Sequence, residues 1–215
     1  MSTCRESIGE CGLHCFGTIS ASISHELKNA LAIINENAGL LEDLSFMAEK
    51  GRPLDPAKLK SLAANISKQI QRADGIIRNM NRFAHSADEP IKCIELGETL
   101  ALTVALSSRL AAMKSITLNF KPPHQPIRVT TRLFYLQNLI WLCLKEILER
   151  AGVEKEITIT LRSLPEGAAV IFSPVDVPAT DGSTLDLLIY MKASQFADSQ
   201  HRELLITLPA DMTTC

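Results

Sequence analysis

The chain has 215 residues, of which 46% are hydrophobic and 21% charged, a balance that is ordinary for a soluble globular protein. Its formal net charge of −2 gives no reason to expect nucleic acid or an anionic membrane as a partner. No apolar run approaches the roughly 20 residues of a membrane span, and the first residues lack the pattern of a signal peptide. We therefore expect a cytoplasmic protein without a membrane partner.

A long amphipathic helix is predicted for the first 50 or so residues. Its apolar residues recur in alternating steps of three and four, the period of a helix with one buried stripe. His25 lies two residues from both Ile23 and Leu27, so at about 100° per residue it points away from that stripe. His25 is thus expected to be exposed. The stripe comprises Phe16, Ile19, Ile23, Leu27, Leu31, Ile34, Ala38, Leu41 and Leu44.

The segment around this histidine, Ser24-His25-Glu26-Leu27-Lys28-Asn29, resembles the H-box of sensor histidine kinases. In that family the run opens the dimerisation and phosphoacceptor helix, and its histidine becomes phosphorylated. The resemblance implies that His25 is the phosphoacceptor, that Glu26 accepts a proton from the imidazole, and that Asn29 orients a water for receiver dephosphorylation. The run departs from the family only at Ala30, where proline is usual. The alternative is a solvated helix face that carries polar residues by chance.

A second helix is predicted after the turn Gly51–Pro56, with Asp55 as its N-cap and Pro56 at its first position. It extends to about Ser86. A hairpin of two helices leaves half of each stripe uncovered, so we expect two copies to form a dimeric four-helix bundle. The second stripe comprises Leu59, Leu62, Ile66, Ile70, Ala73, Ile77, Met80 and Ala84.

Folding this hairpin about residue 52 brings His25 opposite about residue 79, because equal numbers of residues climb each arm. Arg78 and Arg82 lie near that level, and Lys28 lies one turn from His25 on its own helix. A guanidinium there suits a phosphoryl group on His25. These three cations are therefore candidate phosphoryl-stabilising residues, although each of them could equally be a solvated surface side chain.

From Cys93 onward the pattern changes to mixed α/β, so we expect domains at 1–90 and 91–215. The order of elements resembles a truncated form of the ATP-binding domain that follows the hairpin in histidine kinases. The predicted fold class is therefore α plus α/β, a helical hairpin followed by a small α/β sandwich. The predicted helices are 96–113, 133–151 and 185–196, and the predicted strands are 116–120, 127–129, 157–161, 168–172 and 204–208, with a hairpin turn at 165–167.

The nucleotide chemistry of that family is not matched by this sequence. In the family, the helix beginning near Tyr135 carries an asparagine that helps to hold magnesium at the triphosphate. Alignment on Gln137 places Lys145 at that position and Trp141 at the preceding asparagine position. An ammonium group cannot ligate a hard cation, which requires oxygen donors. We therefore expect that this chain binds no nucleotide cofactor or metal.

Glycine usage leads to the same expectation. No Gly-x-Gly occurs after residue 90, and without such glycines the backbone cannot bring several N–H groups close to a phosphate. Prolines follow the predicted strand 168–172, and the stretch to the next helix is too short for an ATP lid. The glycines after residue 90 are Gly97, Gly152, Gly167 and Gly182, and the prolines are Pro174 and Pro178.

Six cysteines are present, and we expect reduced thiols rather than a disulfide framework. Cys11, His14 and Cys15 fall within about one helical turn, with Cys4 nearby. A soft metal or a redox role is conceivable there, but Cys-x-x-x-Cys is a weak pattern and no second ligand pair with zinc spacing exists. Ordinary thiols remain the simpler interpretation.

The full H-box without nucleotide motifs resembles the dimeric histidine phosphotransferases that are built like kinases with a degenerate ATP domain. We therefore expect a homodimer in a two-component phosphorelay, passing phosphate between His25 and receiver-domain aspartates. Magnesium is expected on the receiver, and receiver phosphatase activity through Asn29 is a further expectation. One alternative is a non-catalytic docking module that regulates a kinase or response regulator. The least favoured alternative is an ATP-dependent histidine autokinase.

Overall fold

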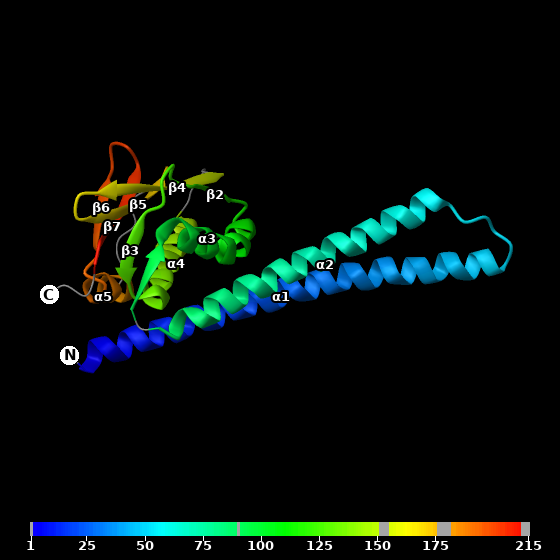
Figure 1. Ribbon diagram of the computed structural model, residues 1–215, viewed down its shortest axis with the longest axis horizontal. Helices are drawn as coiled ribbons and strands as arrows, with labels where there is room; N and C mark the ends of the chain where they lie inside the picture. Colours follow the sequence, from blue (N-terminus) through cyan, green and yellow to red (C-terminus); the bar gives the residue numbers. More distant parts are fainter. Residues whose placement is uncertain (1, 90, 151–154, 176–181, 212–215) are drawn as a thin grey trace. The chain divides into compact units, whose positions relative to one another are not determined.

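Two long helices open the computed structural model, which describes residues 2–89, 91–150, 155–175 and 182–211. Helix α1 (Ser2–Glu49) and helix α2 (Pro56–Ala84) form a hairpin (Figure 1). The connecting turn includes Gly51 at a φ of 83°, a backbone conformation that favours glycine. The backbone N–H of Ala57 donates to Oδ1 of Asp55 at 2.9 Å. The predicted N-cap at Asp55 is therefore confirmed.

The second half of the chain is an α/β sandwich. Its larger sheet has five strands in the order β2-β4-β5-β7-β6, in which β2 and β4 are parallel and the other neighbours antiparallel; β1 and β3 form a separate antiparallel pair. The elements after α2 are η1 (His85–Ala87), β1 (Lys92–Glu95), α3 (Leu96–Met113), β2 (Thr117–Lys121), β3 (Arg128–Thr131), α4 (Leu133–Arg150), β4 (Glu156–Leu164), β5 (Gly167–Ser173), α5 (Gly182–Tyr190), β6 (Ser194–Asp198) and β7 (Glu203–Pro209).

The core of this sandwich lies between the five-stranded sheet and the helices α3 and α4 (Figure 1). Alternate residues of β7 and of the first half of β4 are buried, as the period of two in a strand predicts, whereas the middle strand β5 is buried at every residue from 168 to 172. Helix α4 buries Leu136 through Leu144 without interruption. The predicted fold class, a helical hairpin followed by an α/β sandwich, is confirmed. Buried members of the sheet include Ile157, Ile159, Val170, Phe172, Leu204 and Ile206.

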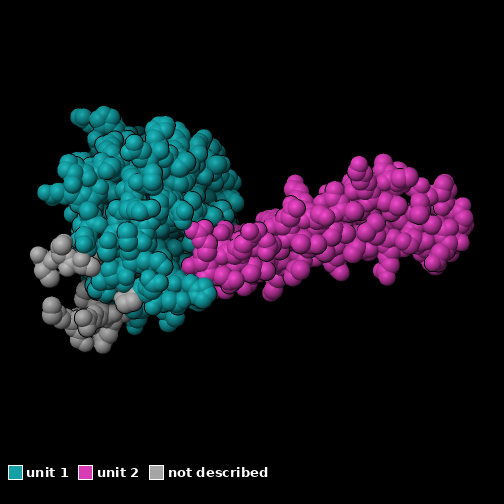
Figure 2. All heavy atoms as spheres, in the orientation of Figure 1, with its two compact units in different colours: residues 1–19, 83–215 teal, residues 20–82 magenta. Residues whose placement is uncertain are grey.

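The chain divides into two compact units, residues 20–82 and residues 1–19 with 83–215 (Figure 2). The start of α1 and the end of α2 belong with the sandwich because aromatic rings join them to α4. The ring of Phe83 stacks on Phe16 with centroids 5.6 Å apart and lies 6.1 Å from that of Phe134. A Cβ at Gly12 would approach Phe134 to 3.0 Å. The division into domains at residue 90 stays a prediction.

The predicted helix 185–196 is wrong at its C-terminal end. Helix α5 ends at Tyr190, Lys192 takes a left-handed φ of 49°, and Ser194–Asp198 forms β6. Pairing of β6 with β7 uses partners distant in the sequence, which the local pattern does not reveal. Strand β1 was also not predicted. The helix 96–113 and the hairpin turn at 165–167 are confirmed.

Candidate functional site

His25 is exposed on α1, as its helical phase predicts. Its neighbours on the hairpin side, Ile23 and Ala30, are 5% and 0% exposed. Within the described residues, no hydrogen bond or ion pair engages the imidazole. Ala30 stands at the position where the H-box usually has proline, and α1 continues through it without a break. Proline at this position would remove a backbone N–H and kink the helix. The buried Ala30 keeps its N–H, so the hairpin stays straight.

Glu26 is directed across the hairpin toward α2. Its carboxylate lies 3.8 Å from a guanidinium nitrogen of Arg72, and the two side chains are 22% and 50% exposed. Arg72 was not among the predicted residues. The sequence gives only a weak signal for the contact between Arg72 and Glu26. This contact depends on the register of the hairpin and on the reach of the long arginine side chain.

A polar contact between the helices shows that register. The Asn65 amide donates to Oδ1 of Asn37 at 3.5 Å, and the Asn37 amide donates to the Ile33 carbonyl at 2.7 Å. Asn37 is twelve residues beyond His25, so the level of His25 on α2 falls twelve residues beyond Asn65, at Ile77. The predicted level of about 79 differs from this by roughly half a turn.

The remaining predicted site residues surround this level without converging on the imidazole. Asn29 and Lys28 are exposed at i+4 and i+3 from His25 and therefore share its side of α1. Arg78 forms an ion pair with Asp74 one turn back on its own helix. Arg82 is exposed more than a turn beyond Ile77. Lys28 and Asn29 therefore share the side of α1 that carries His25, whereas Arg78 is engaged by Asp74.

The position on α4 that aligns with the family's magnesium-binding asparagine is Lys145, which supplies no oxygen ligand. The Lys145 ammonium lies over the ring of Trp141, 5.7 Å from its centroid, and the indole is 2% exposed. The neighbouring Glu146 accepts a hydrogen bond from the Thr184 hydroxyl at 3.0 Å, which ties α4 to α5. An ammonium group over a buried indole offers no oxygen ligand, so this position does not fit the magnesium triphosphate that the family resemblance implies.

The described glycines of the second half serve structural turns. Gly167 begins β5 at a φ of 157°, and a Cβ there would meet the Leu208 carbonyl oxygen at 1.9 Å. Gly97 lies in the first turn of α3, which Glu95 caps by accepting from the N–H groups of Gly97 and Glu98 at 2.9 and 2.8 Å. Gly152 and the prolyl segment at 176–178 lie outside the described residues.

Among the cysteines near the N-terminus, Cys15 is buried and Cys11 half-buried, whereas His14 is exposed. Burial, together with the nearby Cys11, raises the pKa of the Cys15 thiol far above its usual range, so Cys15 remains a neutral thiol. In the described part of the chain no group of three or more His, Cys, Asp or Glu side chains is placed to hold a metal ion. The side chain of Cys4 lies outside the described residues.

The sequence segment that forms the helical hairpin and carries the exposed His25 matches a known family. Residues 17–89, about a third of the chain, match the family described as His Kinase A (phospho-acceptor) domain. This segment is a His Kinase A domain. The predicted resemblance of residues 24–29 to the H-box is thereby confirmed, and a phospho-acceptor domain supports a role in two-component signalling. No curated protein matches the sequence.

Solved structures similar to this chain include the catalytic domain of histidine kinase ThkA, at 12% identity and a TM-score of 0.48, covering 57% of this chain and 99% of that one. Another is the Acinetobacter baumannii histidine kinase AdeS, at 9% identity and a TM-score of 0.47, covering 86% and 98% of the two chains. A third is the ATP binding domain of PrrB from Mycobacterium tuberculosis, at 10% identity and a TM-score of 0.44, covering 57% and 98%. Within the described helices, none has the length and apolar character needed to cross a membrane.

Proposed function

We propose that this protein is a homodimeric histidine phosphotransferase, which accepts a phosphoryl group on His25 from one receiver aspartate and passes it to another. The observation that carries the proposal is the exposed His25 with Glu26 and Asn29 beside it, on a helix matched by the His Kinase A family. The donor set at Lys145 supports transfer between proteins over autophosphorylation from ATP. Because receiver domains are its proposed partners, we place the protein in the cytoplasm.

The transfer step uses the lone pair of one imidazole nitrogen of His25. This nitrogen attacks the phosphorus of the receiver's aspartyl phosphate, the acyl phosphate P–O bond breaks, and the aspartate leaves as a carboxylate. The other ring nitrogen carries the proton, which Glu26 accepts as the phosphohistidine forms. The reaction requires a neutral imidazole, the form that an ordinary histidine largely takes near pH 7. Magnesium belongs to the receiver's acidic pocket.

Two neighbouring side chains complete the proposed site. Lys28, exposed one turn from His25, places an ammonium beside the transferred phosphoryl group. Asn29, on the same side of α1, is positioned to orient a water for hydrolysis of the receiver's acyl phosphate. Arg78 and Arg82 remain candidates, but Arg78 is held by Asp74, which favours Lys28.

The test is transfer of ³²P from receiver domains of the same organism, each labelled with radioactive acetyl phosphate. Wild type is expected to gain acid-labile label, and His25→Ala is expected to gain none. His85→Ala is a matched control, since His85 is another exposed histidine, at the start of η1 directly after α2. Equal labelling of wild type and His25→Ala would refute the proposal. A docking module would be favoured if wild type gained no label and His25→Ala bound the receiver as tightly as wild type.

A further inference from the structure

The edge of strand β4 is left without a neighbour over its last residues. Strand β2 pairs with β4 in parallel from Thr117↔Glu156 to Lys121↔Thr160, whereas β4 continues to Leu164. Pro122 and Pro123 follow directly after Lys121. Because proline has no backbone N–H, the β2 side of the ladder cannot continue past this point.

The main chain of Ser163 points to this open side. Leu164 pairs with Gly167 across a two-residue turn, and Ser163 pairs with Ala168. In such a hairpin the residues flanking the turn form the hydrogen-bonded pair, and hydrogen-bonded and non-hydrogen-bonded pairs then alternate. Ser163 is therefore at a non-hydrogen-bonded position, so its N–H and C=O point away from β5 and toward the space that β2 does not fill.

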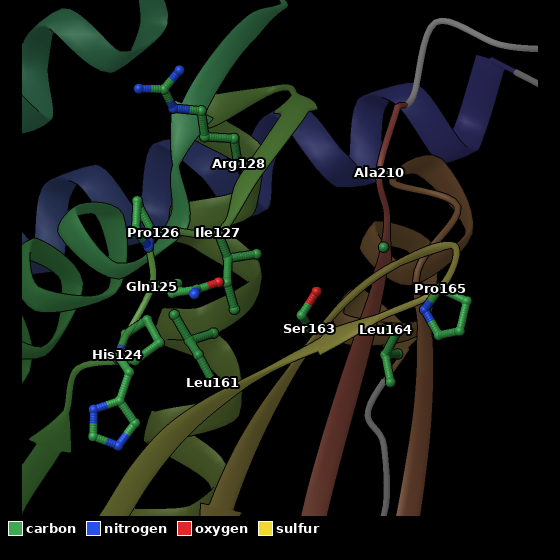
Figure 3. A pocket seen from close by; sticks show the side chains of 12 residues that line it. His124, Gln125, Pro126, Ile127, Arg128, Leu161, Ser163, Leu164, Pro165 and Ala210 are labelled. Carbon is green, nitrogen blue, oxygen red and sulfur yellow. The ribbon is translucent and has the colours of Figure 1, made fainter.

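A cleft of about 500 Å³ occupies that space. Figure 3 shows its two sides: Gln125 and Ile127 from the β2–β3 loop face Leu161 and Ser163 from β4. Three prolines stiffen the loop side of the cleft, namely Pro122, Pro123 and Pro126. A preformed wall reduces the entropy lost when an extended chain enters.

The cation Arg128 is the permanently charged side chain among the described residues that line the cleft. Its lining includes His124 and Arg128, and no acidic side chain is among the described residues that line it. An occupant of complementary charge carries carboxylates, which a basic rim attracts and orients.

We propose that this cleft docks an extended, acidic segment of a partner protein, which pairs with the main chain of Ser163 as an added strand. Strand addition supplies backbone hydrogen bonds, and alternate side chains of the segment supply specificity. Its apolar residues contact Ile127 and Leu161, and its carboxylates face Arg128. This docking site is separate from His25 and does not depend on phosphotransfer.

The probe is an acetylated, fluorescein-labelled hexapeptide of alternating glutamate and valine, added to the full-length protein. We expect saturable binding by fluorescence anisotropy, and amide shifts in ¹⁵N NMR spectra centred on Ser163, Ile127 and Gly167. A peptide with lysine in place of glutamate is expected to bind at least tenfold more weakly because of the basic rim. Absence of binding, equal binding of the lysine peptide, or shifts elsewhere on the protein would overturn the proposal.

Two pairs of variants locate the contact. Ser163→Pro removes the N–H that faces the cleft and is expected to weaken peptide binding about tenfold, whereas Ser163→Ala keeps that N–H and stays within about twofold. Arg128→Gln is expected to weaken binding about threefold, and Lys114→Gln, which removes an exposed cation elsewhere, to leave it unchanged. Well-dispersed NMR spectra establish that Ser163→Pro is folded. If Ser163→Pro is unfolded, strand addition is tested by the amide shifts that the peptide causes in the wild-type protein. Shifts that do not include the Ser163 amide would refute it.

Discussion

A guanidinium nitrogen of Arg72 on α2 lies 3.8 Å from a carboxylate oxygen of Glu26, the residue that follows His25 on α1. This contact turns the Glu26 side chain toward the hairpin while the imidazole faces solvent. The orientation of the proposed proton acceptor therefore depends on the second helix. Arg72 is a positioning residue, since it contacts Glu26 rather than the reacting histidine.

Arg72→Gln is expected to slow phosphotransfer from a labelled receiver about two- to fivefold, the size of effect that suits a partly exposed ion pair. The reason is that Glu26 loses the contact that restricts its rotamers. Arg72→Lys should retain most of the rate, and the pH dependence of the transfer rate should change only in Arg72→Gln. The measurement is the single-turnover rate against pH, with Arg78→Gln as the matched arginine control. An unchanged pH profile would show that Arg72 is merely a surface residue.

The proposed homodimer rests on apolar residues that one hairpin does not cover. Leu31, Ile70 and Ile77 belong to the predicted stripes, yet they are 59%, 54% and 46% exposed in the single chain. The register given by Asn37 and Asn65 brings Leu31 and Ile70 to nearly the same level. Burial of such side chains against a second copy is the stable solution for an open hairpin.

Replacing Leu31 and Ile70 together by glutamate is expected to convert a dimer to a monomer, because two charges would enter the apolar interface. The dimer dissociation constant should rise at least about 100-fold. Multi-angle light scattering gives the molar mass, and Leu185→Glu is the control, since Leu185 is 52% exposed on α5. A wild-type monomer at micromolar concentration, or a double variant that stays dimeric, would contradict this interface.

Local sequence patterns predicted the helices and the phase of His25 because those features depend on near neighbours. Helix α3 matches its predicted limits, with Glu95 capping its first turn. Strand β6 and the ion pair at Arg72 were missed for one shared reason. Both depend on partners far along the chain, β7 in one case and Glu26 across the hairpin in the other, and no local period encodes them.

Phe83→Ala tests the aromatic packing that joins the helix ends to α4. The Phe83 ring is 1% exposed between Phe16 and Phe134, so its removal leaves a cavity. The free energy of unfolding should fall by about 3–5 kcal/mol. Chemical denaturation followed by circular dichroism measures this, and Phe46→Ala is the control because Phe46 is 56% exposed and should change stability by less than about 1 kcal/mol. Similar losses for the two variants would argue against a core role for Phe83.

Nucleotide binding is expected to be weak. Lys145 lies over Trp141 at the position aligned with the family's magnesium-binding asparagine, and its ammonium group would repel the metal instead of ligating it. Calorimetry with a non-hydrolysable ATP analogue and magnesium should detect no binding tighter than about 1 mM. Micromolar binding that Lys145→Gln abolishes would mean that the lysine contacts the triphosphate directly. Incubation with labelled ATP alone should leave His25 unphosphorylated.

The β6–β7 turn is expected to respond to pH through Asp198 and His201. Nδ1 of His201 lies 2.7 Å from Oδ2 of Asp198, while Oδ1 accepts from the N–H groups of Gln200 and His201 at 2.9 and 3.1 Å. The hydrogen bond to Asp198, followed by its charge, raises the pKa of the His201 imidazole. The same bond to the His201 side chain, followed by the backbone bonds, lowers the pKa of Asp198.

The directions of the two pKa shifts set the pH range over which the pair of Asp198 and His201 stabilises the turn. The His201 contribution is complete below the ordinary histidine pKa of about 6.5 and is lost as the pH rises through the higher folded value. The Asp198 contribution is complete above the ordinary aspartate pKa of about 3.9 and is lost as the pH falls. The turn should therefore be best ordered between about pH 4 and 6.5. An NMR titration of the His201 ring measures its midpoint, which Asp198→Asn should lower and Asp88→Asn should leave unchanged. An Asp198→Asn midpoint equal to that of wild type would mean that the pair does not form in solution.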